Sequence, residues 1–300
     1  MSPTGNPGAI PAQAIVLICG SVLCFTLLDT TMKYLTHFFP VPLLVWGRWS
    51  VQVVATLLWL GRGGVGELMR TQRLPMHLFR GGILLCSSLC FMTALRYLPL
   101  ADATAINYST PILVALMATF ILKERLTRAR MGFVLAGFAG MLLIVRPGSE
   151  ILTGAALLAM GSAGFYATFQ ILTRMLSGEH PKVLLFIPAL VGTVVLTLAL
   201  PWIELPPQVS WVHVAMLIAG SLMGTFGHFL FILAFSRAPA SGLAPFTYLQ
   251  LVWATLLGWL VFGDFPGVFT LLGMGVIAGS GLLLALHERR RAAPDPTSVG

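Results

Sequence analysis

Charged residues are scarce in this sequence. Asp, Glu, Lys and Arg make up only 9% of the 300 residues, whereas a soluble globular domain carries roughly 25%. Hydrophobic residues make up 57%, and the mean hydropathy is +0.90. So little charge excludes the water-facing surface of a soluble domain, and we expect lipid to be the main solvent of the chain.

Motifs of catalysis and metal binding are also missing. The four cysteines, Cys19, Cys24, Cys86 and Cys90, lie in apolar runs without Cys-x-x-Cys spacing or neighbouring histidines. We interpret them as small apolar filler rather than as metal ligands or a disulfide. The sequence contains no HExxH, GxSxG or paired-aspartate motif. We therefore predict no catalytic residue, no metal and no cofactor.

The placement of positive charge argues against binding to nucleic acid. The formal net charge is +8, but the 18 Lys and Arg residues form short clusters between apolar stretches. Such clusters are typical of membrane topology rather than of a nucleic-acid surface. Residues 1–13 carry no positive charge before the first apolar run, so they do not resemble a cleaved signal peptide. We expect them to form a short tail before a retained first helix.

Apolar stretches long enough to span a bilayer recur along the chain. They predict ten transmembrane helices, at residues 14–36, 42–61, 77–98, 101–122, 129–146, 151–176, 183–201, 211–235, 240–262 and 268–287. No stretch remains for a soluble domain. The predicted fold class is an all-α membrane protein, located as a multi-pass protein in the bacterial inner membrane.

The distribution of Lys and Arg orients these helices. With the N-terminus inside, the cytoplasmic segments hold fourteen basic residues, namely Arg62, Arg70, Arg73, Arg80, Lys123, Arg125, Arg128, Arg130, Arg174, Lys182, Arg237, Arg289, Arg290 and Arg291. The opposite side holds three, which are Lys33, Arg96 and Arg146. The positive-inside rule therefore predicts that both termini are cytoplasmic.

The two halves of the chain match at a nearly constant offset. At 140 residues, Phe91, Ala94, Pro99, Tyr108, Leu116 and Glu124 align with Phe231, Ala234, Pro239, Tyr248, Leu256 and Asp264; at 141 residues, Gly20, Ser21, Lys33, Leu35, Gly132 and Gly140 align with Gly161, Ser162, Arg174, Leu176, Gly273 and Gly281. We infer a duplication, with five-helix repeats at residues 14–148 and 149–288 and a cytoplasmic tail at 289–300. An odd number of spans inverts the second copy, and inverted repeats place a substrate site near the midplane between them.

A family resemblance is carried by residues 91–148, FMTALRYLPLADATAINYSTPILVALMATFILKERLTRARMGFVLAGFAGMLLIVRPG. A helix ending near Pro99 is followed by a small-residue turn, a mid-helix Pro111, Glu124 before a basic loop, and a Gly-rich helix. This pattern resembles a repeat of the EamA type in the drug/metabolite transporter superfamily. A second copy, at residues 231–288, keeps the frame more loosely, and the resemblance covers nearly the whole chain.

The resemblance implies two inverted five-helix halves, with the first, third, fourth, sixth, eighth and ninth helices around a central cavity. Within the superfamily the sequence is most similar to bacterial exporters of aromatic and other amino acids. It therefore implies export of small amphipathic metabolites. Two alternatives stay open: a transporter of a larger polar metabolite or drug, such as a nucleotide derivative or S-adenosylmethionine, and, more distantly, a membrane-embedded enzyme.

Polar groups inside the spans are candidate substrate ligands, because hydrocarbon tolerates them only against protein or a water-filled cavity. In the fourth helix, Asn107 and Tyr108 precede Pro111, which removes a backbone hydrogen bond and predicts an irregular turn. The ninth helix repeats this pattern, with a proline before Tyr248 and Gln250. We predict that Tyr108 and Tyr248 grip a ligand from both halves; the alternative is that both are packing residues.

The first and sixth helices add Phe25 and Asp29 in one half and Tyr166 and Gln170 in the other, at matching positions. Asp29 is the clearest intramembrane carboxylate, so it is a candidate to bind a cation, a substrate ammonium or a proton. Lys33 lies one turn beyond Asp29 and is the expected structural partner that neutralises it.

Two further basic side chains complete the candidates. Arg48 lies inside the second helix beside Trp46 and Trp49. It either reaches the outer surface, with the tryptophans as an interfacial belt, or pairs with a substrate carboxylate. His228, in the middle of the eighth helix, either titrates and lines the cavity with Phe231 or is a hydrogen-bonded packing residue.

Small-residue patterns at Ala136–Gly140 and Gly275–Gly279 permit close approach of backbones within one chain or between two. We expect a monomer or a weak homodimer. The expected partners are the small-molecule substrate and the lipid bilayer.

Overall fold

The computed structural model describes residues 11–60, 66, 69–121, 123, 128–146, 154–176, 178–206, 208–238 and 240–292. The elements assigned in these ranges are helices: α1 (Ala12–Leu35), α2 (Val41–Leu60), α4 (Leu74–Tyr97), α5 (Leu100–Asn107), α6 (Thr110–Ile121), α7 (Arg128–Val145), α8 (Gly154–Met175), α9 (Pro181–Ala199), the 3₁₀ helix η2 (Leu200–Trp202), α10 (Trp211–Phe235), α11 (Ala240–Thr247), α12 (Leu249–Phe262) and α13 (Val268–Ala292). The predicted all-helical class is confirmed.

Each of the ten predicted segments coincides with one helix or with a broken pair of helices. In the described residues, eight helical segments are long and apolar enough to cross a membrane, and α5 with α6 counts as one of them. Two shorter apolar stretches, Met131–Val145 and Val268–Leu284, lie in α7 and α13. The predicted helix ends at 61, 122 and 151 fall outside the described residues, as do Glu124 and the predicted repeat boundary at 148–149.

The two predicted tails are shorter than expected where they are described. α1 already begins at Ala12, inside the predicted tail at 1–13. α13 continues through Ala292, past the predicted start of the second tail at residue 289. Residues 1–10 and 293–300 lie outside the described part of the chain.

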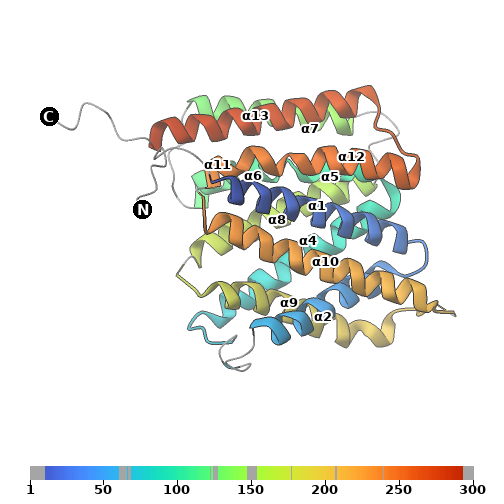
Figure 1. Ribbon diagram of the computed structural model, residues 1–300. Coiled ribbons are helices and arrows are strands. Elements are labelled where there is room, and N and C mark those ends of the chain that lie inside the picture. Colours follow the sequence, from blue (N-terminus) through green and yellow to red (C-terminus); the bar gives the residue numbers. More distant parts are fainter. Residues whose placement is uncertain are drawn as a thin grey trace.

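The helices lie side by side in one stacked bundle (Figure 1). α7 and α13 form one edge, α2 and α9 form the opposite edge, and the remaining helices fill the middle (Figure 1). The start of α1 and the end of α13 lie at the same end of the bundle, which we call the termini end. The opposite end, where α1, α4, α7 and α12 finish, is called the far end.

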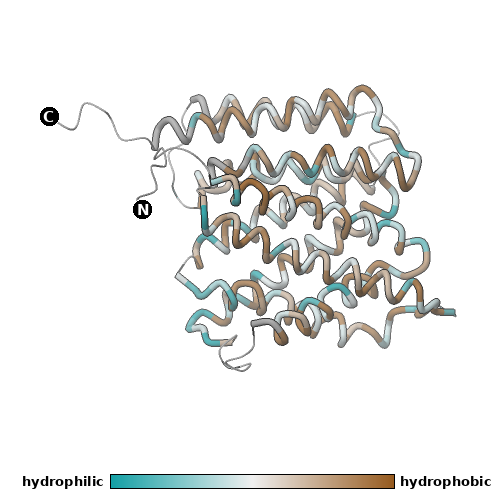
Figure 2. The backbone as a smooth tube through the Cα atoms, viewed as in Figure 1, coloured by the Kyte–Doolittle hydropathy of each residue, from teal (hydrophilic) through white to brown (hydrophobic). Residues whose placement is uncertain are grey.

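The surface of this bundle requires a bilayer. Large apolar side chains such as Leu58, Phe120 and Leu198 are more than two-thirds exposed, at 73%, 75% and 68%. Figure 2 shows hydrophobic residues along the helices and hydrophilic residues mostly near their ends and in the loops. Water would make such exposure unfavourable, whereas acyl chains accept it.

Several pairs of helices that pack together have an equivalent pair when each helix is replaced by its counterpart in the other half of the chain. α1 packs against α10, and correspondingly α8 packs against α4. The pairs α4–α9 and α6–α8 likewise have the counterparts α10–α2 and α12–α1. A hydrogen bond joins each of two corresponding helix pairs, with the donor and acceptor helices reversed: Ser21 Oγ on α1 donates to Gly227 O on α10 at 2.8 Å, and Ser87 Oγ on α4 donates to Ser162 O on α8 at 3.0 Å. These matched pairs support the predicted duplication.

The close approach expected from small residues occurs within the chain, between α7 and α13. A Cβ added to Gly140 would lie 2.9 Å from Gly273 O, and one added to Gly273 would lie 2.6 Å from Gly140 O. Only hydrogen atoms fit there. The predicted pattern at Gly275 and Gly279 is not part of this contact, because a Cβ at either position would meet nothing within 4 Å among the described residues.

Candidate functional site

Two membrane-spanning segments are broken near mid-length, and the breaks face each other. Pro111 has no N–H, so the carbonyl of Asn107 loses its helical donor. The hydroxyl of Thr110 donates to that carbonyl at 2.7 Å instead, and the chain changes from α5 to α6 at Tyr108 and Ser109. The predicted irregular turn is confirmed. A corresponding break separates α11 from α12 at Tyr248.

The predicted tyrosine pair is brought together at these breaks. The rings of Tyr108 and Tyr248 lie 5.4 Å apart between centroids. The Tyr108 hydroxyl donates to Thr247 O at 2.6 Å and contacts Gln250 Oε1 at 3.0 Å, so it stabilises the break in the other half. The Tyr248 hydroxyl packs against Gly281 so closely that no Cβ fits there. Contact of either tyrosine with a substrate stays a prediction.

Asp29 interacts electrostatically with Arg48 rather than with Lys33. Asp29 is 8% exposed on α1, and its carboxylate interacts electrostatically with the Arg48 guanidinium of α2. Lys33 points elsewhere and donates to Leu95 O at 3.0 Å and Leu98 O at 2.6 Å. The predicted Asp29–Lys33 pair is therefore wrong. The carbonyls of Leu95 and Leu98, at the end of α4, accept directly from the Lys33 ammonium, whereas the Asp29 carboxylate lies one turn away from Lys33 on the same helix.

The inward position of Arg48 also corrects the expected tryptophan belt. Arg48 interacts electrostatically with Tyr166 of α8 as well as with Asp29, which favours the inward position over the outward-reaching one. Trp49 is only 3% exposed and fills the space beside Gly192, where no Cβ fits. Trp46 donates its ring N–H to Thr197 Oγ1 at 2.8 Å. Both tryptophans thus pack α2 against α9.

His228 and Phe25 join the group from α10 and α1. Their rings meet edge to face at 4.6 Å between centroids. The Nδ1 atom of His228 lies 2.9 Å from Gly224 O, one turn back on its own helix, and the side chain interacts electrostatically with Arg48. The contact with Gly224 O holds the His228 ring in place, and the ring still packs against Phe25.

Asn107 and Gln170 are the predicted site residues that the structure links least to the others. Both are half-buried. Asn107 Oδ1 is buried without a hydrogen-bond partner among the described residues. Gln170 lies one turn beyond Tyr166 on α8, and no described contact joins it to the remaining candidates. Their assignment as substrate ligands stays a prediction.

Arg80 is a buried cation that the sequence reasoning counted only as a cytoplasmic charge. It is 2% exposed, donates from Nε to Thr173 Oγ1 at 2.7 Å and from Nη1 to Leu184 O at 3.1 Å, and lies 4.3 Å over the Phe169 ring. Pro188, inside α9, leaves the Leu184 carbonyl without its helical donor. The signal was available, since position 80 falls inside the predicted helix 77–98.

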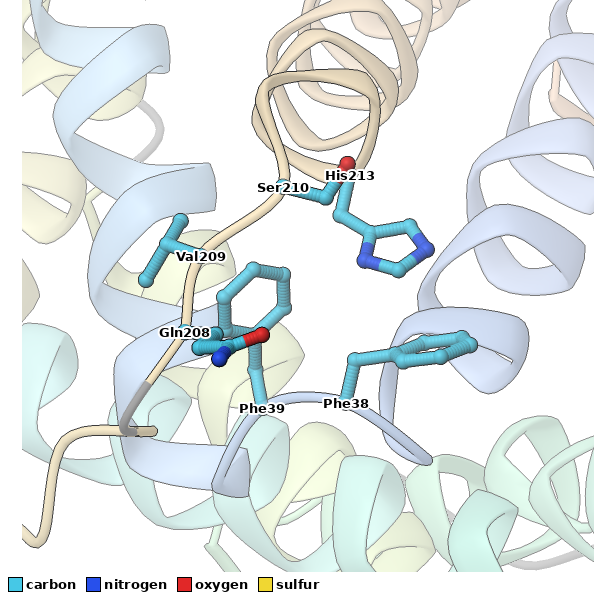
Figure 3. Close-up of a pocket in the computed structure, with 6 residues that line it drawn as sticks. All are labelled: Phe38, Phe39, Gln208, Val209, Ser210 and His213. Carbon is cyan, nitrogen blue, oxygen red and sulfur yellow. The ribbon is translucent and has the colours of Figure 1, made fainter.

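A pocket at the far end is separate from this central group. It has a volume of about 320 Å³ and is lined by Phe38, Phe39, Gln208, Val209, Ser210 and His213. Figure 3 shows the His213 ring above Phe38, and their centroids lie 3.8 Å apart. None of the predicted site residues lines this pocket.

Comparison with known proteins gives a consistent assignment. The model of the EamA-like transporter family matches twice, at residues 12–146 and 153–286. Three similar proteins are each 26% identical to this chain. A riboflavin transporter of Vibrio cholerae aligns over 94% of this chain and 96% of its own length, and an S-adenosylmethionine uptake transporter of Rickettsia bellii over 87% of this chain and 89% of its own length. The pseudopaline exporter CntI of Pseudomonas aeruginosa aligns over 87% of this chain and 92% of its own length. A solved structure described only as "Crystal structure of protein" aligns with a TM-score of 0.62 and 20% identity over 93% of this chain and 99% of that one, which shows the fold alone.

Proposed function

This chain belongs to the EamA-like transporter family, and from that premise we propose that it exports small amphipathic metabolites, with amino acids as the favoured class. It is a multi-pass protein of the bacterial inner membrane. The names of its relatives are those of transporters rather than enzymes. These names favour transport over the alternative of a membrane-embedded enzyme.

One observation carries the proposal: a carboxylate and a guanidinium lie together inside the membrane-spanning bundle, among aromatic rings. Asp29 complements a substrate ammonium, and Arg48 complements a substrate carboxylate through parallel N–H donors. Phe25, Tyr166 and His228 supply apolar and edge contacts beside them. An amino-acid head group with an apolar side chain has this same pattern of charge and surface.

A second class of substrate carries the same amino-acid head group. None of the three named relatives is an amino-acid exporter, and one is named for uptake of S-adenosylmethionine. S-adenosylmethionine carries an amino-acid head and a planar base, so the same two charges fit it. The buried Arg80, not expected from the sequence, is a second cation near Tyr166, but it donates to Thr173 and Leu184 and so does not distinguish between these substrates.

Alternating access is the proposed mechanism. Two inverted repeats rock against each other around a fixed central site. The exchange symmetry of the packing pairs supports this arrangement, as does the double match of the family model. The breaks at Tyr108 and Tyr248 supply irregular backbone where each half meets the other.

Counterflow in proteoliposomes tests the proposal. Liposomes loaded with unlabelled phenylalanine, S-adenosylmethionine or riboflavin receive the same solute in labelled form outside. We expect accumulation of a solute that carries both an ammonium and a carboxylate, and loss of that accumulation in Arg48→Met at equal protein insertion. Arg96→Gln is the matched control, because Arg96 is exposed at a helix end over its neighbour Tyr97. Counterflow of riboflavin alone would contradict the proposed substrate class, and counterflow of none of the three would contradict the proposed function.

A further inference from the structure

Four charged side chains meet at the far end of the bundle, away from the central site. They are Lys33 on α1, Asp102 on α5, Arg146 directly after α7, and Asp264 after α12. We call them the far-end charge cluster. Two cations and two carboxylates balance in charge, which a low-dielectric position requires.

Lys33 is the centre of this cluster. It is 7% exposed, and its ammonium donates to the carbonyls of Leu95 and Leu98 at the end of α4. It lies 5.2 Å over the Phe262 ring and interacts electrostatically with Asp264 and Asp102. A buried ammonium has three donors to satisfy, and here they connect α1 with α4 and α5.

Asp102 and Arg146 extend the cluster to α13. Asp102 interacts electrostatically with Arg146 and lies near the hydroxyl of Thr270 on α13. The Arg146 guanidinium lies 4.2 Å over the Phe269 ring. Lys33 and Arg146 thus contact helices other than their own, and the two carboxylates interact with these cations electrostatically.

The helices around the central site form two sets. α1 packs against α10, α11 and α12, whereas α8 packs against α4, α5 and α6. Between the two sets, the packed pairs in the described residues are α5–α12, α1–α4 and α1–α5. All three pairs meet at the far end, where α1, α4 and α12 finish and α5 begins.

The termini end is packed less closely between the two sets among the described residues. Exchange of the two halves converts these pairs into α11–α6, α8–α10 and α8–α11, and none of these is among the packed pairs of the described residues. These three pairs therefore have weaker counterparts, or none, at the termini end. Among the described residues, the two sets pack more closely at the far end than at the termini end.

From this geometry we propose that the far-end charge cluster is a gate, and that transport requires the bond between Lys33 and the α4–α5 corner to break so that the central site opens at the far end. A single buried ammonium that donates to two backbone carbonyls forms a contact that is either made or lost. Opening exposes these groups to water, which replaces their hydrogen bonds. The inference rests on alternation between two sides, as in the proposed function, but not on the identity of the substrate.

The gate is tested by labelling a reporter thiol from each side of the membrane. Asn107→Cys, at the central helix break, is placed in a background in which the four native cysteines are replaced by serine. Right-side-out and inverted vesicles are treated with a membrane-impermeant thiol reagent without any substrate. Lys33→Met and Asp102→Asn should raise the rate of labelling from the far-end side roughly tenfold, which corresponds to about 1.4 kcal/mol and is close to the value of one charged hydrogen bond. Labelling from the termini side should fall.

Two variants separate a gate from a loss of folding. Lys33→Arg keeps the cation and should label as slowly as the parent protein. Arg96→Gln removes a cation from the same end of α4 but outside the cluster, and it should also leave the rate unchanged within about twofold, since an exposed charge contributes little. Each variant is first required to elute as a single species from size-exclusion chromatography in detergent. Equal far-side labelling in Lys33→Met, Asp102→Asn and the parent would overturn the gate. Because no substrate is added, this result is independent of whether the counterflow experiment succeeds.

Discussion

At the scale of single residues, the decisive feature is which groups satisfy each buried charge. Lys33 is held by two carbonyls of another helix, and the cation that interacts with Asp29 is Arg48. Breaking a buried ion pair leaves an uncompensated charge, which costs far more than the pair gained. A zwitterionic substrate would supply its ammonium to Asp29 and its carboxylate to Arg48 when these side chains separate, so neither buried charge would be left without an opposite charge.

Arg48 and Asp29 should therefore affect substrate binding in a manner that depends on the substrate's charges. Arg48→Met should raise the KM for phenylalanine roughly 10- to 100-fold, because a charge-assisted pair contributes about 1.5–3 kcal/mol. The KM for phenylalaninamide, which lacks the carboxylate, should change much less in this variant. Asp29→Asn should weaken both solutes, because both carry the ammonium. Initial rates of counterflow give these constants, and an equal loss for both solutes in Arg48→Met would show that Arg48 is structural.

The tyrosine pair gives a second residue-scale prediction. Tyr108→Ala and Tyr248→Ala should weaken transport of aromatic or large apolar amino acids more than that of small polar ones. An aromatic contact beyond area burial contributes about 0.5–1.5 kcal/mol, which is a factor of about 2 to 13 in affinity. Tyr108→Phe keeps the ring but removes the donor to Thr247 O, so it should lower thermal stability while retaining the substrate preference. Unchanged affinities for every solute in both alanine variants would assign the tyrosines to packing.

At the scale of elements, prolines create carbonyls without donors, and side chains from elsewhere satisfy them. Thr110 does so for Asn107 within the same turn, whereas Arg80 reaches from α4 to Leu184 on α9. The sequence predicted the lost backbone bond and the irregular turn at Pro111, because both effects are local, but not that Thr110 replaces the donor. It does not predict the second, since the spatial neighbour of Pro188 depends on how the helices pack.

The Arg80 bond predicts a coupling between two positions 108 residues apart in the sequence. Arg80→Met should lower the free energy of unfolding by about 1–3 kcal/mol, because the Leu184 carbonyl is left buried without a donor. Pro188→Ala restores a backbone N–H to that carbonyl, so Arg80→Met should cost less in the Pro188→Ala background. Thermal unfolding in detergent of the parent, both single variants and the double variant measures this difference. Strictly additive effects would contradict the assigned role of Arg80.

The α7–α13 crossing gives a matched test with two glycines of one helix. Gly273→Leu should destabilise the protein by about 1–3 kcal/mol, because its side chain would fall on Gly140 O and Ile144. Gly275→Leu should be tolerated, since a Cβ there meets nothing within 4 Å. Both variants are compared by thermal unfolding in the same detergent. A similar loss in both would mean that the Gly275 face is covered by a second copy of the chain.

At the scale of the whole molecule, hydropathy and spacing predicted the helices well, because a bilayer imposes length and apolarity on every span. The helix breaks were also predicted, since prolines act locally. The partners of Asp29, Lys33 and Arg80 were not, because each lies on another helix and depends on how the helices pack. The spacing of one helical turn predicted Lys33 as the partner of Asp29. The packing of α1 against α4 instead gives the Lys33 ammonium two carbonyl acceptors.

Orientation in the membrane remains the prediction on which the direction of transport depends. Fourteen basic residues on one side against three on the other place both termini in the cytoplasm by the positive-inside rule. Gln208 and Gln72 are exposed and lie in loops at opposite ends of the bundle. In a cysteine-free background, Gln208→Cys should react with an impermeant thiol reagent added to intact cells, whereas Gln72→Cys should react only after the membrane is permeabilised. The reverse pattern would place the far-end charge cluster on the cytoplasmic side, and the proposed gate would then close the inner rather than the outer entrance.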